Sequence, residues 1–132
     1  MKFLLDTNIC IYALKQQPAV IKHLLAEAPT DIGLSVISEG ELRTGAAKSA
    51  TAARTTRLLE SFLRPLTVIE FTSDDAKTYA EVRARLERGG TPIGPLDTLI
   101  AAQAVARSLV LISNNEREFK RVPGLRLGNW LR

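Results

Sequence analysis

The amino-acid sequence predicts a three-layer α/β fold in which helices cover both faces of a short-stranded, mostly parallel β-sheet. Short apolar runs of strand type alternate along the chain with longer segments of helical pattern, which is typical of such a sheet. The strand-type runs are continuously apolar, as expected when both faces of the sheet are buried. No internal repeat or low-complexity segment divides the 132 residues, so we expect a single domain over residues 1–132.

The first half of the chain contains two predicted strands, each followed by helices. The periodic segments lie, in order, at residues 2–5 (strand), 9–14 and 18–28 (helices), 31–36 (strand) and 49–63 (helix). Ser38 is predicted to cap a further helix after the second strand, with Glu41 three residues on as in a capping box. Pro65 closes the helix at 49–63 because proline cannot continue a helix.

The second half repeats the alternation of strands and helices. Its predicted elements are a strand at 66–71, helices at 73–88 and 96–107, a strand at 109–112, a short helix that ends at 119 and a short last strand at 125–127. Ser73 is expected to cap the helix at 73–88, and Gly89 and Gly90 are expected to end it. Residues 91–95 are predicted as a loop that leads into the Ala-rich helix.

The charge of the chain favours an anionic partner. The sequence has 18 Lys and Arg against 14 Asp and Glu, a net charge of +4, and a pI of about 9.6. Nucleic acid or an acidic protein would suit this balance, although a merely basic surface explains it equally well.

The single cysteine and the apolar segments indicate a protein of the cytoplasm. Cys10 cannot form an internal disulfide or a thiolate metal site alone, and its position between Ile9 and Ile11 predicts a small buried side chain. A lone free thiol fits a reducing compartment. The apolar runs are far shorter than the ~20 residues of a membrane span, and Asp6 interrupts the first run too early for a signal peptide.

Acidic residues recur where the predicted strands end. Asp6 directly follows the first strand, and Glu118 follows the fourth strand closely enough to reach back toward the same edge. Asp97, in the first turn of the Ala-rich helix, shares the apolar face of that helix with Ile100 and Ala101. An inward carboxylate of this kind needs a cation or several hydrogen-bond donors to offset its desolvation.

Glu41 repeats the pattern one helical turn after the second strand. Gly45, on the same predicted helix face, would let another backbone approach closely.

Taken alone, each acid has an ordinary explanation as a turn, cap or solvated helix residue. Four ionised carboxylates at one edge would repel one another, however, and a divalent cation would resolve that repulsion. Oxygen-only ligands select Mg²⁺ or Mn²⁺. His23 is the only histidine and is predicted on a solvated helix, which argues against zinc and against a histidine base.

The order of these residues resembles that of a known family. The motifs are Leu5-Asp6-Thr7-Asn8-Ile9, Ser38 with Glu41-Leu42-Arg43-Thr44-Gly45, Pro92-Ile93-Gly94 with Asp97 and Ala101-Ala102, Ser113-Asn114-Asn115 with Glu118-Phe119, and Val122-Pro123-Gly124-Leu125 with Asn129-Trp130. Together they are similar to the PIN-domain toxins, in particular the VapC toxins of type II VapBC toxin–antitoxin systems. The resemblance covers essentially the whole chain and implies a PIN-like (Rossmann-like) domain.

This resemblance implies roles for individual residues. Asp6, Glu41 and Asp97 would be the main catalytic acids and Glu118 the fourth, with Asp6 and Asp97 holding the metal ion. The polar neighbours that would orient acids or water are Thr7, Asn8, Ser113 and Asn115. Asn115 is neutral where many relatives carry Asp, which weakens the case for a second metal site. The expected reaction is Mg²⁺- or Mn²⁺-dependent hydrolysis of RNA phosphodiesters that leaves a 5′-phosphate and a 3′-hydroxyl.

The resemblance also implies partners. VapC-type toxins cut structured RNA, and the subgroup this chain resembles is associated with tRNA, including initiator tRNA. Candidate RNA-binding residues are Arg43, Lys48, Arg88, Arg117 and Lys120, and beyond these Arg83, Arg85 and Arg121. A VapB antitoxin would lay its C-terminal segment across the acids. A homodimer is expected, for which the apolar residues near Leu58–Leu63 are candidates, although core packing explains them equally well.

Two other classes of protein remain as alternatives. A non-catalytic PIN module would serve only as an interaction scaffold, but such modules lose acids that this chain keeps. A Rossmann-like phosphatase with Asp6 as nucleophile would usually need a second acid two residues on, where this chain has Asn8.

Overall fold

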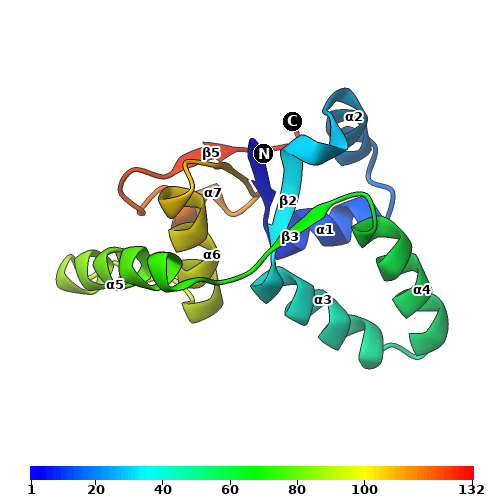
Figure 1. The fold of residues 1–132 in the computed structure, drawn as a ribbon, viewed down its shortest axis with the longest axis horizontal. Helices are drawn as coiled ribbons and strands as arrows, with labels where there is room; N and C mark the ends of the chain where they lie inside the picture. The colour runs from blue at the N-terminus through cyan, green and yellow to red at the C-terminus, as the bar shows by residue number, and fades with distance from the viewer.

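Five parallel strands form the centre of the molecule in a computed structural model that describes all 132 residues (Figure 1). The strand order is β3-β2-β1-β4-β5. The strands are β1 (Phe3–Leu5), β2 (Ile32–Ser35), β3 (Thr67–Ile69), β4 (Val110–Ile112) and β5 (Arg126–Gly128). In the register of the sheet, Leu5 of β1 lies opposite Leu34 of β2 and Ile112 of β4. Because every strand is parallel to its neighbours, all carboxyl ends lie at one edge of the sheet.

Helices cover both faces of this sheet. One group consists of α1 (Thr7–Leu14), α2 (Pro18–Ala26), α3 (Val36–Ala47) and α4 (Ala52–Leu63), with a short 3₁₀ turn η1 (Pro29–Asp31) before β2. The other group consists of α5 (Ser73–Arg88), α6 (Pro95–Ala106) and α7 (Glu116–Phe119). Figure 1 shows α5 and α6 on one side of the strands and α1 to α4 on the other.

Two hydrophobic clusters, one on each face, hold these layers together. Leu5 and Ile112 pack with α1 to α4, whereas Leu4 and Leu111, their neighbours in β1 and β4, pack with α5 and α6. Successive strand residues point to opposite faces, so continuously apolar strands are needed to fill both clusters. The predicted three-layer α/β fold is therefore confirmed, and the sheet is parallel throughout.

The ends of several elements differ from the prediction. Ser35, not Ser38, caps α3, because its side chain accepts from the Ile37 N–H at 3.0 Å. Ser38 instead lies buried inside α3, so the predicted capping box with Glu41 is wrong. Likewise Thr72, not Ser73, caps α5. Another Ser or Thr precedes each predicted cap, by three residues at Ser38 and by one residue at Ser73, and the pattern alone does not choose between them.

Other predictions about single residues can be compared with the structure. Cys10 is fully buried, as predicted. His23 is not simply solvated, because its ring stacks on Trp130 with the centroids 5.4 Å apart, and its Nε2 lies 2.8 Å from the Arg132 carbonyl oxygen. No helix combines the length and the apolar character that crossing a membrane requires.

Candidate active site

The sheet brings acidic residues from four separate segments to the carboxyl ends of its strands. Asp6 directly follows β1, Glu41 lies in α3 after β2, and Glu118 lies in α7 after β4. Asp97 lies in the first turn of α6. The charges of Glu118, Asp6 and Glu41 each raise the pKa of Asp97, so the four carboxylates act on one another although they lie far apart in sequence.

Asp6 is the most firmly held of these acids. It is the N-cap of α1, and its Oδ1 accepts from the Ile9 N–H at 2.9 Å. Only 4% of Asp6 is exposed. This burial raises the pKa of Asp6, while hydrogen bonds from the Ser113 hydroxyl and the Ile9 N–H lower it and the charge of Glu41 raises it, with a net increase. The bonds from Ile9 and Ser113 therefore fix the position of the Asp6 carboxylate relative to the other acids.

Asp97 has the clearest electrostatic signature. Burial raises the pKa of this half-buried carboxyl to about 6, assisted by the charges of Glu118, Asp6 and Glu41 and by a hydrogen bond with Glu118. A position in the first turn of a helix normally favours a carboxylate. Desolvation and like charges therefore act here against the preference of a helix start for a carboxylate, which is the arrangement expected where a cation binds.

Two polar neighbours fix the glutamates. The Thr7 hydroxyl lies 2.6 Å from Glu41 Oε1 and 3.0 Å from the Ser38 hydroxyl. Asn115 Nδ2 donates to Glu118 Oε2 at 2.8 Å. Asn8, by contrast, is exposed, and its side chain makes no hydrogen bond to an acid.

Ser113 links the two sides of the site. This fully buried side chain bonds to Asp6 and accepts from the Asn115 N–H at 2.8 Å. Hydrogen bonds thus run from Asp6 through Ser113 and Asn115 to Glu118. Ser38 is the site residue that the sequence analysis missed, although its spacing of three residues from Glu41 places both on one face of α3.

The donor set of the site suits a hard divalent cation. All four side chains offer carboxylate oxygens, and neither cysteine nor histidine lies among them. No three His, Cys, Asp or Glu side chains come close enough to surround an ion by themselves. Mg²⁺ commonly keeps several waters and binds through only one or two carboxylates, so this spacing fits the ion better than a closed cage would.

The predicted RNA-binding residues lie in different environments. Arg43 is paired with Glu39 at 2.8 Å and Glu60 at 2.6 Å, which occupies its guanidinium. The others, all exposed and without an ion pair, are Lys48, Arg88, Arg117 and Lys120. Arg117 and Lys120 flank Glu118 in and directly after α7.

Gly45 faces open space, since a Cβ there would meet nothing within 4 Å, so the predicted close backbone approach is wrong.

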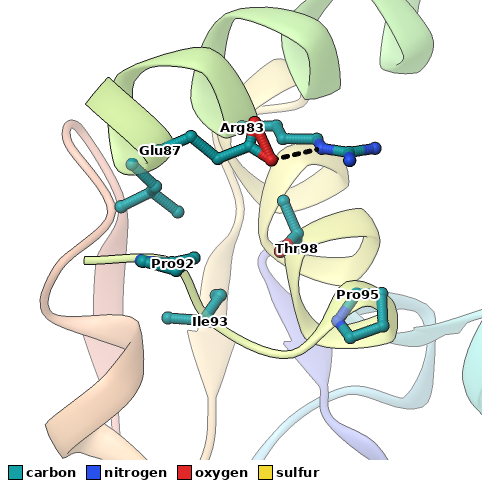
Figure 2. A pocket seen from close by; sticks show the side chains of 7 residues that line it. Arg83, Glu87, Pro92, Ile93, Pro95 and Thr98 are labelled. Carbon is teal, nitrogen blue, oxygen red and sulfur yellow. Dashed lines mark hydrogen bonds and ion pairs between the residues drawn. The ribbon is translucent and has the colours of Figure 1, made fainter. Parts of the chain in front are cut away.

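A small cavity of about 150 Å³ borders the loop before Asp97 without containing any of the four acids. Figure 2 shows it between α5, the loop with Pro92 and Ile93, and the start of α6. Arg83 at its rim donates to Glu87 Oε1 at 3.1 Å and to the Tyr79 hydroxyl at 3.0 Å. Because Arg83 is already paired, this cavity offers no free cationic group for a phosphate.

The fold and the carboxylates together place the chain in a known class. Residues 3–125 match the PIN domain, and the chain belongs to the PIN-domain family. It is 39% identical to the tRNA(fMet)-specific endonuclease VapC of Salmonella typhimurium, with 98% of both chains covered. It is 41% identical to ribonuclease VapC2 of Rickettsia felis over 98% of both chains. The chain therefore belongs, within that family, with the VapC ribonucleases.

A solved structure supports the same conclusion. The VapBC2 complex of Rickettsia felis, bound to a DNA fragment from its promoter, contains a chain that superimposes with a TM-score of 0.93 at 39% identity. The match covers 98% of this chain and 99% of the other.

Proposed function

We propose that this protein is the toxin of a VapBC toxin–antitoxin module, an endoribonuclease that cuts tRNA, including initiator tRNA, and so inhibits translation in the cytoplasm. The observation that carries the proposal is that the fold brings Asp6, Glu41, Asp97 and Glu118 from four separate segments to the carboxyl edge of the sheet, within range of one another's charge. Interacting carboxylates of this kind are a marker of a functional site. The name of the Salmonella typhimurium relative supports initiator tRNA as the substrate.

We assign the cation, Mg²⁺ or Mn²⁺, to Asp6 and Asp97. When bound, such an ion polarises the phosphodiester and lowers the pKa of a water molecule. Asp6 is held by the start of α1 and Asp97 by the start of α6, so both carboxylates are positioned before substrate arrives.

Glu41 and Glu118 would orient the attacking water and accept its proton. Each is oriented by a hydrogen bond, from Thr7 and Asn115 respectively, and each keeps a second carboxylate oxygen free of these bonds. One of them would accept a proton as the water attacks phosphorus. The bond from phosphorus to the 3′ oxygen then breaks, and the products carry a 5′-phosphate and a 3′-hydroxyl.

The partners follow from the same site. A groove of about 510 Å³ between α1, α3 and α4 reaches Glu41 and includes the exposed Leu58. An antitoxin segment seated there could cover the acids, and this supports VapB as the partner. Leu59 and Leu63 are buried within the chain, so core packing accounts for them, and of the leucines in this stretch only the exposed Leu58 is left for a homodimer. We propose that the 132 residues act as a single domain.

The test is cleavage of tRNA by purified, antitoxin-free protein. Initiator tRNA, elongator methionine tRNA and total tRNA are incubated with the protein and Mg²⁺, and new RNA ends are mapped. We expect one discrete cut that carries a 5′-phosphate and disappears with EDTA or in Asp97→Asn. A wild-type protein that cuts none of these RNAs, or an Asp97→Asn variant as active as wild type, would favour the non-catalytic scaffold.

A further inference from the structure

A second recess borders the acids on the side of β4. It has a volume of about 230 Å³ and lies between α1 and the turn that joins β4 to α7. Its lining residues are Asn8, Tyr12, Asn114 and Asn115. Asn8 lies two residues after Asp6, and Asn115 holds Glu118, so the recess adjoins two of the four acids.

The side chains of the recess keep hydrogen-bonding groups that the protein does not use. The Asn8 amide and the Tyr12 hydroxyl make no hydrogen bond within the chain. Asn114 accepts through Oδ1 from Asn129 at 3.0 Å, which leaves its NH₂ group free. Asn115 donates through Nδ2, which leaves its Oδ1 free. The recess therefore presents both donors and acceptors, and no charge.

Tyr12 adds an aromatic surface to these polar groups. It lies four residues after Asn8, so both side chains occupy the same face of α1. Tyr12 packs against the hydrophobic cluster under α1, and the residue is half-buried. A ring supported in this way loses little conformational freedom when a flat ligand stacks on it.

These features disfavour two other kinds of occupant. A phosphate group is bound most strongly by cationic side chains, and none lines the recess. An apolar side chain of a protein partner would bury the free amides and the phenol without partners, which is costly. An unpaired nucleobase, in contrast, stacks on an aromatic ring and exchanges hydrogen bonds along its edge.

We propose that this recess is a nucleobase subsite for a nucleotide next to the scissile phosphodiester. Tyr12 stacks on the base, and Asn8 and Asn114 bond to its edge. This inference rests on the proposed ribonuclease function and deepens it, because it requires the RNA to be unpaired at the cut.

The test pairs a protein change with the removal of a base. Single-stranded RNA oligonucleotides that contain the mapped cleavage site are prepared intact and with an abasic nucleotide on either side of the scissile bond. Cleavage is measured as kcat/KM for wild type, Tyr12→Leu and Asn114→Ala, and binding is measured by fluorescence anisotropy. Tyr79→Leu changes the only other tyrosine, a half-buried one on α5, and serves as the matched control.

We expect one abasic position to lower wild-type kcat/KM and affinity about tenfold, in line with the usual contribution of base stacking. Tyr12→Leu should lower kcat/KM and affinity for the intact oligonucleotide by a similar factor. For the abasic oligonucleotide, the kcat/KM and affinity of Tyr12→Leu should be nearly the same as those of wild type. Two changes that remove the same contact are not additive. Tyr79→Leu should behave as wild type with every oligonucleotide.

The outcomes separate the subsite from the ribonuclease function. Wild-type protein that binds the oligonucleotides with this Tyr12 dependence but cuts neither them nor tRNA would overturn the function alone. Active protein in which the effects of Tyr12→Leu and base removal simply multiply would overturn the subsite and leave the function standing. Should Tyr12→Leu fail to fold, Asn114→Ala serves in its place, because Asn114 is exposed and its replacement does not disturb the core. The decrease in kcat/KM caused by Asn114→Ala must also be smaller on the abasic oligonucleotide than on the intact one.

Discussion

The Thr7 hydroxyl donates a 2.6 Å hydrogen bond to Glu41 Oε1 across 34 residues of sequence. Thr7 begins α1 directly after Asp6, so one short segment both supplies an acid and orients a second one on α3. The parallel pairing of β1 with β2 brings the two helices to the same edge of the sheet. The position of Glu41 therefore depends on the turn at Asp6.

We predict that Thr7→Val lowers kcat by roughly tenfold to a hundredfold, because a hydrogen bond to a charged group contributes about 1.5–3 kcal/mol. Thr7→Ser keeps the hydroxyl and should retain most of the activity. Steady-state cleavage of tRNA checks both variants, with urea unfolding to confirm that they are folded. Equal activities of the Val and Ser variants would mean that Thr7 does not position Glu41.

Asp97→Asn should abolish cleavage and yet stabilise the metal-free protein. The pKa of Asp97 is about 6 in the folded protein against 3.8 for the free side chain. The folded state therefore holds a proton that the unfolded chain releases between about pH 4 and pH 6. Above pH 6 the ionised carboxylate destabilises the fold, by about 1 kcal/mol after allowance for its partial exposure.

The measurement is thermal unfolding in EDTA across this pH range. At pH 7.5 the variant should melt roughly 3–5 °C above wild type. The difference should decline steadily between pH 6 and pH 4, where Asp97 of the folded protein becomes protonated. Asp74→Asn, which changes a carboxyl 92% exposed on α5, is the matched control and should show no such difference. An increase in the melting temperature of Asp97→Asn that does not depend on pH would show that the charge of Asp97 is not its cause.

Local patterns in the amino-acid sequence predict the acids, whereas their hydrogen-bond partners Thr7, Ser113 and Asn115 follow only from the family resemblance. Asp6 is predicted because a residue directly after a strand must lie at the carboxyl edge of a parallel sheet, and Glu118 because the short helix after the fourth strand can reach back to that edge. Asp97 was found because an acid on an apolar helix face is unusual. The bond between Thr7 and Glu41 joins two elements, and local pattern carries no information about which residues of two helices meet.

The errors at Ser38 and Gly45 have the same origin. A Ser followed three residues later by Glu is a common capping pattern and predicts a cap at Ser38, yet Ser35 three residues earlier takes that role. A glycine on a helix face predicts a close approach at Gly45, but α4 lies far enough away to leave a groove beside it. Distances between helices depend on the packing of the whole layer, which the sequence shows only indirectly.

Removal of the metal ion should stop cleavage completely. EDTA should abolish activity, and excess Mg²⁺ or Mn²⁺ should restore it. Binding of the ion should also raise the melting temperature of wild type, since a ligand that binds only the folded state stabilises it by about 2.7 kcal/mol at a hundredfold excess over its Kd. Asp97→Asn should lose most of this increase. Cleavage that persists in EDTA would contradict the assignment of the ion to Asp6 and Asp97.

The affinity for the ion should fall as the solution is acidified through pH 6. The proton on Asp97 competes with the cation, and the pKa of about 6 places this competition within an accessible range. Isothermal titration with Mn²⁺ at pH 7.5 and pH 5 should show roughly tenfold weaker binding at the lower pH. An affinity that is constant over this range would indicate that Asp97 is not a ligand.

Arg107→Ala should destabilise the protein without changing the chemistry of cleavage. Arg107 Nη2 donates to Asp75 Oδ2 at 2.9 Å, and the Asp75 side chain is only 2% exposed. Burial alone would raise the pKa of Asp75, but bonds from Arg107, the Thr72 N–H and Gln103 together lower it. Removal of Arg107 leaves a buried carboxylate without its cation, which we expect to cost about 2 kcal/mol in the free energy of unfolding.

This ion pair joins the C-terminal end of α6 to the start of α5, whereas Asp97 lies at the opposite end of α6. Because the pKa of Asp75 is lowered on folding, the pair stabilises the protein above the ordinary pKa of Asp and loses that effect as the pH falls through the lowered value. The decrease in the free energy of unfolding caused by Arg107→Ala should therefore be greatest at pH 7 and smaller below pH 4. Urea unfolding at the two pH values measures it. Arg83→Ala breaks an exposed surface pair with Glu87 and should change stability little. If Arg107→Ala lowered kcat at temperatures where the protein stays folded, the pair would have to be regarded as part of the active site.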